Sequence, residues 1–268
     1  QIGVPTVVSF WPHPREILFG ESRLRLDLPT EKTLLLKPLG IEQLVLVPFN
    51  KTLASKSAET FVNEILVKAL QAKHIAVGEN FRFGCNRQGD ISTLKKMGEY
   101  LGIKVSIIPI LEDNDGRISS SRIRKALNEG DLRHAKSLLK RPYTFTGTVE
   151  KGKGLGKTIG WPTANLKIDG RKFLPSLGVY AAWAAIANNK ERFSAVMNLG
   201  PQPTIDPRSS STVEVHLLEE EINLLGKELI IEPVHRIRVQ KKFKSLEELS
   251  KQISSDAKLA KELLTKNL

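Results

Sequence analysis

The sequence pattern of this chain changes at the stretch Arg141–Val149, RPYTFTGTV. Within it, threonines alternate with aromatic, small or apolar residues, which is the two-residue period of a strand with one buried face. Upstream, Val- and Ile-rich runs are separated by helical periodicity, whereas downstream one strand-like run follows another. We therefore predict one domain over residues 1–140 and a second over residues 141–268, with the boundary near Lys140–Tyr143.

The second half predicts an antiparallel barrel or sandwich followed by helices. Its strand-like runs are separated by Gly, Pro and Asn at the spacing of such folds. After the run at Tyr143–Val149, the further runs are Gly178–Ala187, Phe193–Asn198, Thr212–Leu218 and Leu229–Val239. Ser245–Glu248 is a capping box that predicts the start of a helix, and Asp256–Leu264 predicts another helix.

The first half predicts an α/β domain. Four short apolar runs have the composition of buried strands: Pro5–Phe10, Gln43–Pro48, His74–Gly78 and Lys104–Pro109. Helical periodicity covers Ser57–Ala72, Asp90–Leu101, Ser119–Asn128 and Asp131–Leu139. Strands that are separated by helices favour a parallel sheet with crossover connections.

The composition is that of a folded protein from a reducing compartment. Of the 268 residues, 40% are hydrophobic and 26% are charged, which argues against intrinsic disorder. Cys85 is the only cysteine, so no disulfide can form within the chain, and no apolar run is long enough for a membrane span. We expect a cytoplasmic protein without a membrane partner. The net charge of +12 is divided equally between residues 1–140 and 141–268, and it attracts anions such as nucleotides.

A glycine-rich loop, Gly152–Thr158, follows the strand predicted at Tyr143–Val149. Its end imitates a P-loop, but Lys151 replaces the first glycine of that motif, and a glycine and a proline follow where a helix would be needed. Exposed backbone N–H groups beside Lys153 and Lys157 would still suit a polyphosphate. The alternative is a solvated hairpin loop.

Thr163 and Asn165, in the sequence WPTAN, are two residues apart. On an extended strand their oxygens point to the same side, where a hydroxyl and an amide carbonyl suit Mg²⁺ or a phosphate oxygen. The alternative is that both side chains satisfy a turn.

Glu214 alternates with valines in the run Thr212–Leu218, so it shares one face of a strand with Thr212 and His216. If this polar face lines a cleft, the carboxylate can take a proton from a substrate hydroxyl. If it faces solvent, Glu214 is simply an exposed residue.

The stretch Ile118–Arg124, ISSSRIR, predicts the start of a helix. Serine hydroxyls, free N–H groups and the positive end of the helix dipole combine there with Arg122 and Arg124, which are fork donors for phosphate. This is either an anion site or an ordinary serine-capped helix with surface arginines.

Taken together, these segments resemble the bacterial bifunctional riboflavin kinase/FMN adenylyltransferase family. The similar stretches run in order through nearly the whole chain: Phe10–Glu16, Val77–Gly84, Ile118–Arg124, Gly160–Asn165, Gly178–Tyr180, Asn198–Thr204, Glu214–Leu218 and Lys242–Phe243. The resemblance implies an N-terminal nucleotidyltransferase-like domain that joins AMP from ATP to FMN. It also implies a C-terminal six-stranded barrel that phosphorylates riboflavin with ATP.

The resemblance also implies site residues, all of them to be tested. In the kinase half, Thr163 and Asn165 match the residues that bind Mg²⁺ and the ATP phosphates, and Glu214 matches the catalytic base. Gly152 and Lys157 match the nucleotide loop, and Arg238 lies in the flavin-side region. In the other half, the matching positions are Asn80, Ser119, Ser120, Ser121, Arg122 and Arg124.

The adenylyltransferase half departs from the family pattern. The family opens with an HxGH segment that binds ATP phosphates, and these 268 residues do not contain that motif. Asn80 stands where many members have Asp, and Ser121 stands where the second phosphate motif usually has Thr. We therefore expect an N-terminally incomplete domain over residues 1–140, with poor or no adenylyltransferase turnover from this polypeptide.

Two other functions compete with flavin synthesis. A basic β-barrel can bind single-stranded nucleic acid, but that function needs an aromatic stacking face, and only 6% of the residues are aromatic. A barrel that carries flavin without catalysis is the other alternative, and the joint presence of Glu214, Thr163 and Asn165 argues against it. The sequence leaves the oligomeric state open.

Overall fold

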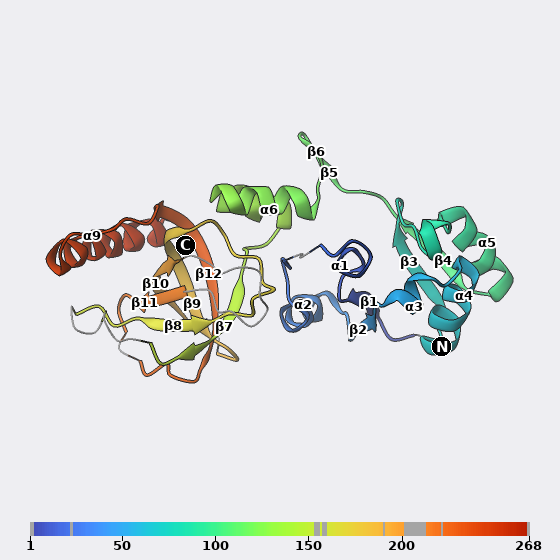
Figure 1. Cartoon of the computed structure of the whole chain (residues 1–268), viewed down its shortest axis with the longest axis horizontal. Helices are drawn as coiled ribbons and strands as arrows, with labels where there is room; N and C mark the ends of the chain where they lie inside the picture. The colour runs from blue at the N-terminus through green and yellow to red at the C-terminus, as the bar shows by residue number, and fades with distance from the viewer. Residues whose placement is uncertain are drawn as a thin grey trace. The chain divides into compact units, whose positions relative to one another are not determined.

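The computed structural model describes residues 3–21, 24–152, 156, 160–189, 191–200, 213–220 and 222–266 (Figure 1). The chain divides into two compact units. The first comprises Gln1–Arg23 and Lys32–Ile118, and the second comprises Leu24–Glu31 and Ser119–Leu268. A short early segment and the helices before residue 140 thus group with the C-terminal half, and the boundary near Lys140–Tyr143 stays a prediction about where the domains separate.

The first unit contains parallel strand pairs with helical crossovers. Its elements are β1 (Thr6–Trp11), α1 (Pro14–Phe19), η1 (Lys37–Leu39), β2 (Gln43–Pro48), α3 (Lys51–Ala54), α4 (Ala58–Phe61), the π-helix η2 (Val62–Ala69), β3 (His74–Gly78), η3 (Cys85–Arg87), α5 (Ile91–Leu101), β4 (Lys104–Ile108), β5 (Glu112–Asp113) and β6 (Gly116–Arg117). Helix α2 (Pro29–Leu36) begins in the segment that belongs to the second unit.

The parallel pairing predicted for the first half is confirmed. Strand β1 pairs with β2, and β3 pairs with β4, both in parallel. Among the described residues these are two separate two-stranded sheets rather than one four-stranded sheet. Helical crossovers predict the direction of the strands, but they do not determine which strands become neighbours.

The two helices predicted within the first unit are found near their predicted bounds, whereas α1, α2 and α3 were not predicted. Asp90 caps α5 and accepts a 2.8 Å hydrogen bond from the Thr93 backbone N–H. The helix predicted over Ser57–Ala72 is found as α4 followed by η2, so most of it has π rather than α geometry. Phe61, Val62 and Leu66 from this helix form the core of the unit together with Leu94 from α5.

The second unit is a closed barrel with flanking helices. Its elements are α6 (Ser120–Glu129), α7 (Leu132–Leu139), β7 (Phe145–Glu150), β8 (Ala164–Lys167), β9 (Gly178–Ile186), β10 (Arg192–Leu199), β11 (Val213–Leu217), β12 (Glu228–Arg238) and α9 (Leu246–Thr265). The strand order around the barrel is β10-β11-β8-β7-β12-β9, with antiparallel pairing throughout. Of the two architectures that the residues left open, the barrel is therefore the one observed.

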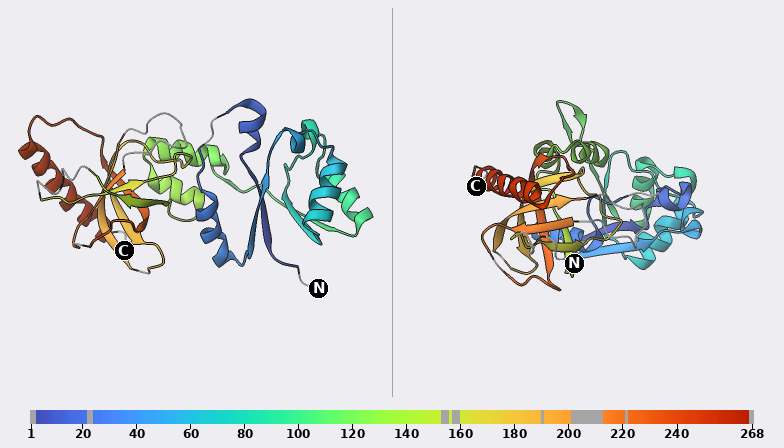
Figure 2. Two further views of the ribbon diagram at one scale, coloured as in Figure 1. Left: turned by 60° about the horizontal axis from the view of Figure 1, so that its bottom comes forward. Right: turned by 60° about the vertical axis from the view of Figure 1, so that its left-hand side comes forward.

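Helix α9 lies along the outside of the barrel (Figure 2). Ala257, Ala260 and Leu264 from α9 pack on Val179 and Val196, which are on the outer face of the sheet. The sequence predicted two helices here, and that prediction is wrong, because one helix runs from Leu246 to Thr265. The stretch contains no Gly or Pro to end it, so the serines in its middle are accommodated within the helix.

A buried ion pair fastens the segment Leu24–Glu31 to the barrel. Lys172 is 0% exposed, and its Nζ donates to Glu31 Oε2 at 2.7 Å and to the carbonyls of Leu26 and Thr144. The other oxygen of Glu31 accepts from the backbone N–H and the hydroxyl of Thr146. Burial lowers the pKa of Lys172, although the Glu31 carboxylate opposes that shift. All this hydrogen-bonding capacity is used within the fold, so the pair is structural.

Candidate active site

A pocket of about 890 Å³ lies on the outside of the barrel, within the second unit. Thr163, Asn165, Glu214, Gly152 and Arg238 all line it. These residues come from separate stretches of the sequence, and the structure brings them together in one pocket. Lys157 and Lys153 lie outside the described residues.

Barrel register sets the geometry of the polar wall. Asn165 on β8 is directly opposite Glu214 on β11, and Glu214 is directly opposite Asn198 on β10. The three polar side chains therefore form a row across adjacent strands. Asn198 Nδ2 donates a 3.3 Å hydrogen bond to Glu214 Oε2.

Strand β11 resolves the two interpretations of Glu214. Val213, Val215 and Leu217 are buried in the barrel, whereas Glu214 and His216 are only partly buried and line the pocket. The apolar face is the core and the polar face lines the pocket, so Glu214 lines a cleft rather than being simply exposed to solvent. His216 is held by a 2.7 Å contact between its Nδ1 and the Pro162 carbonyl, and its ring meets Trp161 edge-on.

Two glycines let the backbone approach the pocket residues closely. A Cβ atom on Gly152 would lie 1.9 Å from Asn165 Nδ2, and one on Gly156 would lie 2.2 Å from the Trp161 carbonyl oxygen. A side chain at position 152 would displace the Asn165 amide, whereas one at position 156 would collide with backbone, so position 156 requires glycine. The Gly152 backbone therefore lies directly against the Asn165 side chain.

Arg238 joins the end of β12 to helix α9. Its Nη2 lies 2.8 Å from Asp256 Oδ2 and its Nε donates to both oxygens of that carboxylate. Asp256 is 3% exposed and also accepts from Gln252. This ion pair holds α9 beside the pocket, where Leu246, Leu249 and Ile253 supply an apolar wall together with Trp161 and Phe243.

The residues proposed for adenylyl transfer are divided between the two units. Ser119 caps α6, with Ser120 and Ser121 in the first turn. Arg124 donates to the Ser120 and Leu24 carbonyls, so its guanidinium already has partners within the second unit. The remaining residues are Arg122, which follows in α6, and Asn80, which belongs to the first unit and accepts at 3.0 Å from Arg117 when its amide is oriented to satisfy both side chains.

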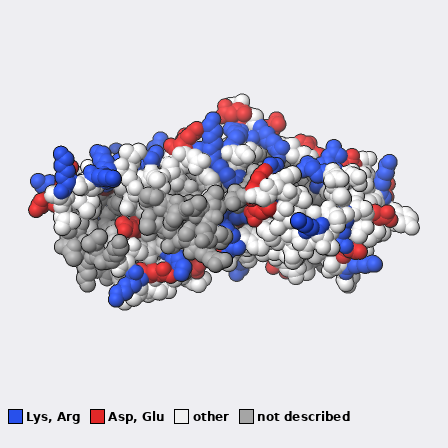
Figure 3. Space-filling model, viewed as in Figure 1, with Lys and Arg blue, Asp and Glu red and all other residues white. Residues whose placement is uncertain are grey.

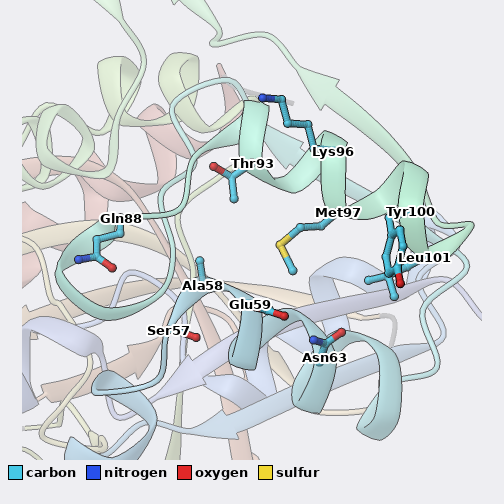
Figure 4. Close-up of a pocket in the computed structure, with 10 residues that line it drawn as sticks. All are labelled: Ser57, Ala58, Glu59, Asn63, Gln88, Thr93, Lys96, Met97, Tyr100 and Leu101. Carbon is cyan, nitrogen blue, oxygen red and sulfur yellow. The ribbon is translucent and has the colours of Figure 1, made fainter.

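A second pocket, of about 510 Å³, lies in the first unit between α5 and the helix formed by α4 and η2 (Figure 4). Two of its hydroxyl groups take part in helix capping: Ser57 accepts from the Thr60 N–H, and Thr93 Oγ1 donates to Asp90. The residues that the sequence analysis proposed as site residues do not line this pocket. The pocket on the barrel is therefore the stronger candidate for chemistry.

The barrel pocket has the properties of an enzyme site for a small organic molecule. Its volume falls within the roughly 300–1,000 Å³ typical of such sites, and it combines an apolar wall with a few convergent polar groups. Basic and acidic side chains are intermixed on the face of the molecule that Figure 3 draws, so the net charge of +12 is spread out rather than gathered on that face. The pocket therefore suits a small organic molecule with an apolar part and a hydrogen-bonding part.

Comparisons with known proteins agree with this class. A riboflavin kinase family model matches residues 139–264, and an FAD synthetase model matches residues 3–122. The chain is 35% identical over 257 residues to the bifunctional riboflavin kinase/FMN adenylyltransferase of Escherichia coli K12, covering 96% of this chain and 81% of that protein. The Haemophilus influenzae protein of the same name is 35% identical over 269 residues, with 97% and 84% covered.

A solved structure is also similar over nearly the whole chain. It is described as a macrolide-efflux protein from Streptococcus pneumoniae, with a TM-score of 0.81, 31% identity, and coverage of 96% of this chain and 83% of that one. Within the described part of the present chain, no helix is long and apolar enough to cross a membrane.

The chain belongs to the bifunctional riboflavin kinase/FMN adenylyltransferase family. The resemblance noted from the sequence is thereby confirmed, and flavin synthesis is favoured over nucleic-acid binding. Sequence reasoning from the residues alone missed Gln240 and Asp256, which line the pocket. Gln240 stands at the end of a predicted strand and Asp256 at the start of a predicted helix, so neither position carried a local signal of function.

Proposed function

We propose that the barrel unit phosphorylates riboflavin with ATP to give FMN, and that the N-terminal half, residues 1–140, joins AMP from ATP to FMN to give FAD. The observation that carries the kinase assignment is the presence of Thr163, Asn165 and Glu214 in one pocket, with Asn165 and Glu214 opposite each other on paired strands. Family membership supports both activities.

In the proposed kinase reaction, Glu214 orients the terminal ribityl hydroxyl and accepts its proton. The hydroxyl oxygen then forms a bond to the γ-phosphorus of ATP, and the bond from that phosphorus to the bridging oxygen breaks, releasing ADP. Phosphoryl transfer of this kind needs mainly positioning and charge neutralisation rather than covalent chemistry. The partly buried Glu214 fits the role, since its carboxylate faces the pocket while its strand is fixed in the barrel.

Thr163 and Asn165 fit the binding of Mg²⁺ that accompanies ATP. Their hydroxyl and amide oxygens are hard donors, and Mg²⁺ in phosphate-transfer sites is usually held by one or two protein ligands, with substrate phosphates and water completing the shell. When bound, the ion would neutralise phosphate charge. The Gly152 backbone against Asn165 would add N–H donors for the same phosphates.

The apolar wall of the pocket suits the flat ring system of riboflavin. Trp161 and Phe243 supply aromatic surface, and Leu246, Leu249 and Ile253 on α9 supply aliphatic surface. We propose that the ring lies on this side, with the ribityl chain directed toward Glu214. Arg238 would act by fixing α9 through Asp256.

For adenylyl transfer, we propose that Asn80, Ser119, Ser120, Ser121, Arg122 and Arg124 bind ATP. Serine hydroxyls and backbone N–H groups at the start of α6 are suitable phosphate donors.

The assay that tests these assignments incubates the chain with riboflavin and Mg·ATP and separates the flavins by chromatography. We expect FMN to form from riboflavin. Absence of FMN would overturn the kinase assignment, and FAD formation from FMN and ATP tests the adenylyl-transfer assignment separately. Thr163→Ala and Asn165→Ala should each require more Mg²⁺ for half-maximal rate, and an unchanged Mg²⁺ dependence would remove them from the metal site.

A further inference from the structure

A chain of hydrogen bonds runs behind Glu214, away from the residues assigned to ATP. Asn198 Nδ2 donates to Glu214 Oε2 at 3.3 Å, and Asn198 Oδ1 accepts from Gln240 Nε2 at 3.1 Å. Gln240 Nε2 also donates to the Leu199 carbonyl at 3.1 Å. The chain thus connects the Glu214 carboxylate to the backbone of β10 through two side-chain amides.

The direction of every hydrogen bond in this chain is fixed. A backbone carbonyl can only accept, so the atom of Gln240 that meets Leu199 must be the amide nitrogen. The same nitrogen then donates to Asn198, whose oxygen must face it and whose nitrogen must face Glu214. A side-chain amide has an ambiguous orientation by itself, and here the Leu199 carbonyl removes that ambiguity.

Asn198 thus presents an N–H donor to the Glu214 carboxylate, and an ionised carboxylate has only acceptor atoms. Asn198 is directly opposite Glu214 on the neighbouring strand, so the rigid barrel sets their separation. Gln240 lies in the segment that follows β12, and Lys241 and Phe243 of the same segment also line the pocket. The orientation of Glu214 therefore depends on the position of this segment.

We propose that Asn198 and Gln240 are positioning residues for phosphoryl transfer, holding the Glu214 carboxylate in the orientation that receives the proton of the ribityl hydroxyl. This inference rests on the proposed kinase function. Asn198 acts directly on Glu214, and Gln240 acts through Asn198 by keeping its amide turned with the nitrogen toward the carboxylate.

The test is a double-mutant cycle measured on the full chain with riboflavin and Mg·ATP. Asn198→Ala should lower kcat roughly 10- to 100-fold with little change in KM, the effect of losing one hydrogen bond to a charged group. Gln240→Ala should lower kcat by about 3- to 10-fold, as for a neutral hydrogen bond. In a Glu214→Gln background, Asn198→Ala should have an effect of about twofold or less, because no base remains to be oriented.

Controls separate positioning from a general loss of structure. Ser194→Ala removes a polar side chain from the same strand, β10, outside the pocket lining, and should leave kcat unchanged. Asn198→Asp keeps the shape of the side chain but replaces the donor with an acceptor, so it should lower kcat at least as much as Asn198→Ala. Thermal unfolding of each variant identifies any that fail to fold.

The outcomes distinguish the inference from the function on which it rests. If the parent chain makes FMN but Asn198→Ala and Gln240→Ala are as active as Ser194→Ala, the inference is wrong and the kinase assignment stands. Equal losses from Asn198→Ala with and without Glu214 would show a structural role and would also overturn it. A parent chain that makes no FMN would overturn both.

Discussion

Two glutamates of the barrel unit show how differently the fold uses a carboxylate. Glu31 is 6% exposed, and its two oxygens accept hydrogen bonds from Lys172, Leu28 and Thr146. Glu214 is only partly buried, lines a pocket of about 890 Å³, and has one oxygen held by Asn198. A buried carboxylate whose oxygens are both hydrogen-bonded within the fold stabilises the structure. A carboxylate that is oriented by one hydrogen bond and faces a cavity is available for chemistry.

The largest expected effect comes from removing the carboxylate that faces the cavity. Glu214→Ala should lower kcat roughly 10²- to 10⁴-fold, the usual effect of losing a general base. Its free energy of unfolding should change by about 1 kcal/mol or less, because the side chain is not in the core. Initial rates of FMN formation and urea unfolding measure the two quantities, and near-normal turnover would remove Glu214 from the mechanism.

The opposite pattern is expected for the buried carboxylate. Glu31→Gln leaves the Lys172 ammonium buried without a counter-ion, so it should lower the free energy of unfolding by about 3–5 kcal/mol. The kcat of the molecules that remain folded should not change. Urea unfolding followed at the barrel, together with rates measured well below the unfolding transition, tests both statements.

Two control variants sharpen this prediction. Adding Lys172→Met to Glu31→Gln should recover stability, since no uncompensated charge then remains buried. Glu150→Gln breaks an exposed ion pair with Lys167 and should cost about 1 kcal/mol or less. If Glu31→Gln is no worse than Glu150→Gln, the anchoring role of the buried pair is refuted.

The fold was predictable from the sequence where its signals are local. The bounds of β2 and β3 agree with the predicted runs, because short Val- and Ile-rich stretches between turns have a clear pattern. The pattern did not predict that the four strands form two separate pairs, nor that Leu24–Glu31 joins the barrel. Lys172 and Glu31 are 141 residues apart, so no local spacing reveals their contact.

The candidate site was predictable to the same extent. Two-residue spacing placed Thr163 and Asn165 on one side of a strand and Glu214 on a polar face. Barrel register was needed to bring Asn165 opposite Glu214, and the path of the chain after β12 was needed to bring Gln240 to Asn198. Register between strands is a property of the whole fold, which explains why the sequence indicated the residues but not their neighbours.

The smallest effect is expected for a third carboxylate, Asp90, which is more exposed than Glu31. Its substitution should change only the pH dependence of stability at α5. Hydrogen bonds from the Thr93 N–H and hydroxyl lower the pKa of Asp90 below its usual value of 3.8. Its contribution to stability is therefore complete above that usual value and is lost as the pH falls through the lowered folded value. Asp90→Asn should keep the helix cap of α5 but lose this dependence.

Hydrogen exchange of the α5 amides between about pH 5 and 2 measures the effect, after correction for the intrinsic exchange rate. The parent chain should lose protection toward the acid end more steeply than Asp90→Asn. Identical pH profiles for the two proteins would show that the Asp90 carboxylate does not stabilise the ionised cap.

The attachment of Leu24–Glu31 to the barrel has a consequence for biosynthesis. A ribosome makes Glu31 141 positions before Lys172. The buried ion pair between them cannot form until both residues have emerged. Formation of this buried ion pair therefore waits for Lys172 and depends on a residue made 141 positions earlier. An expression fragment that starts after residue 118 would leave the cation of Lys172 without the carboxylate that neutralises it.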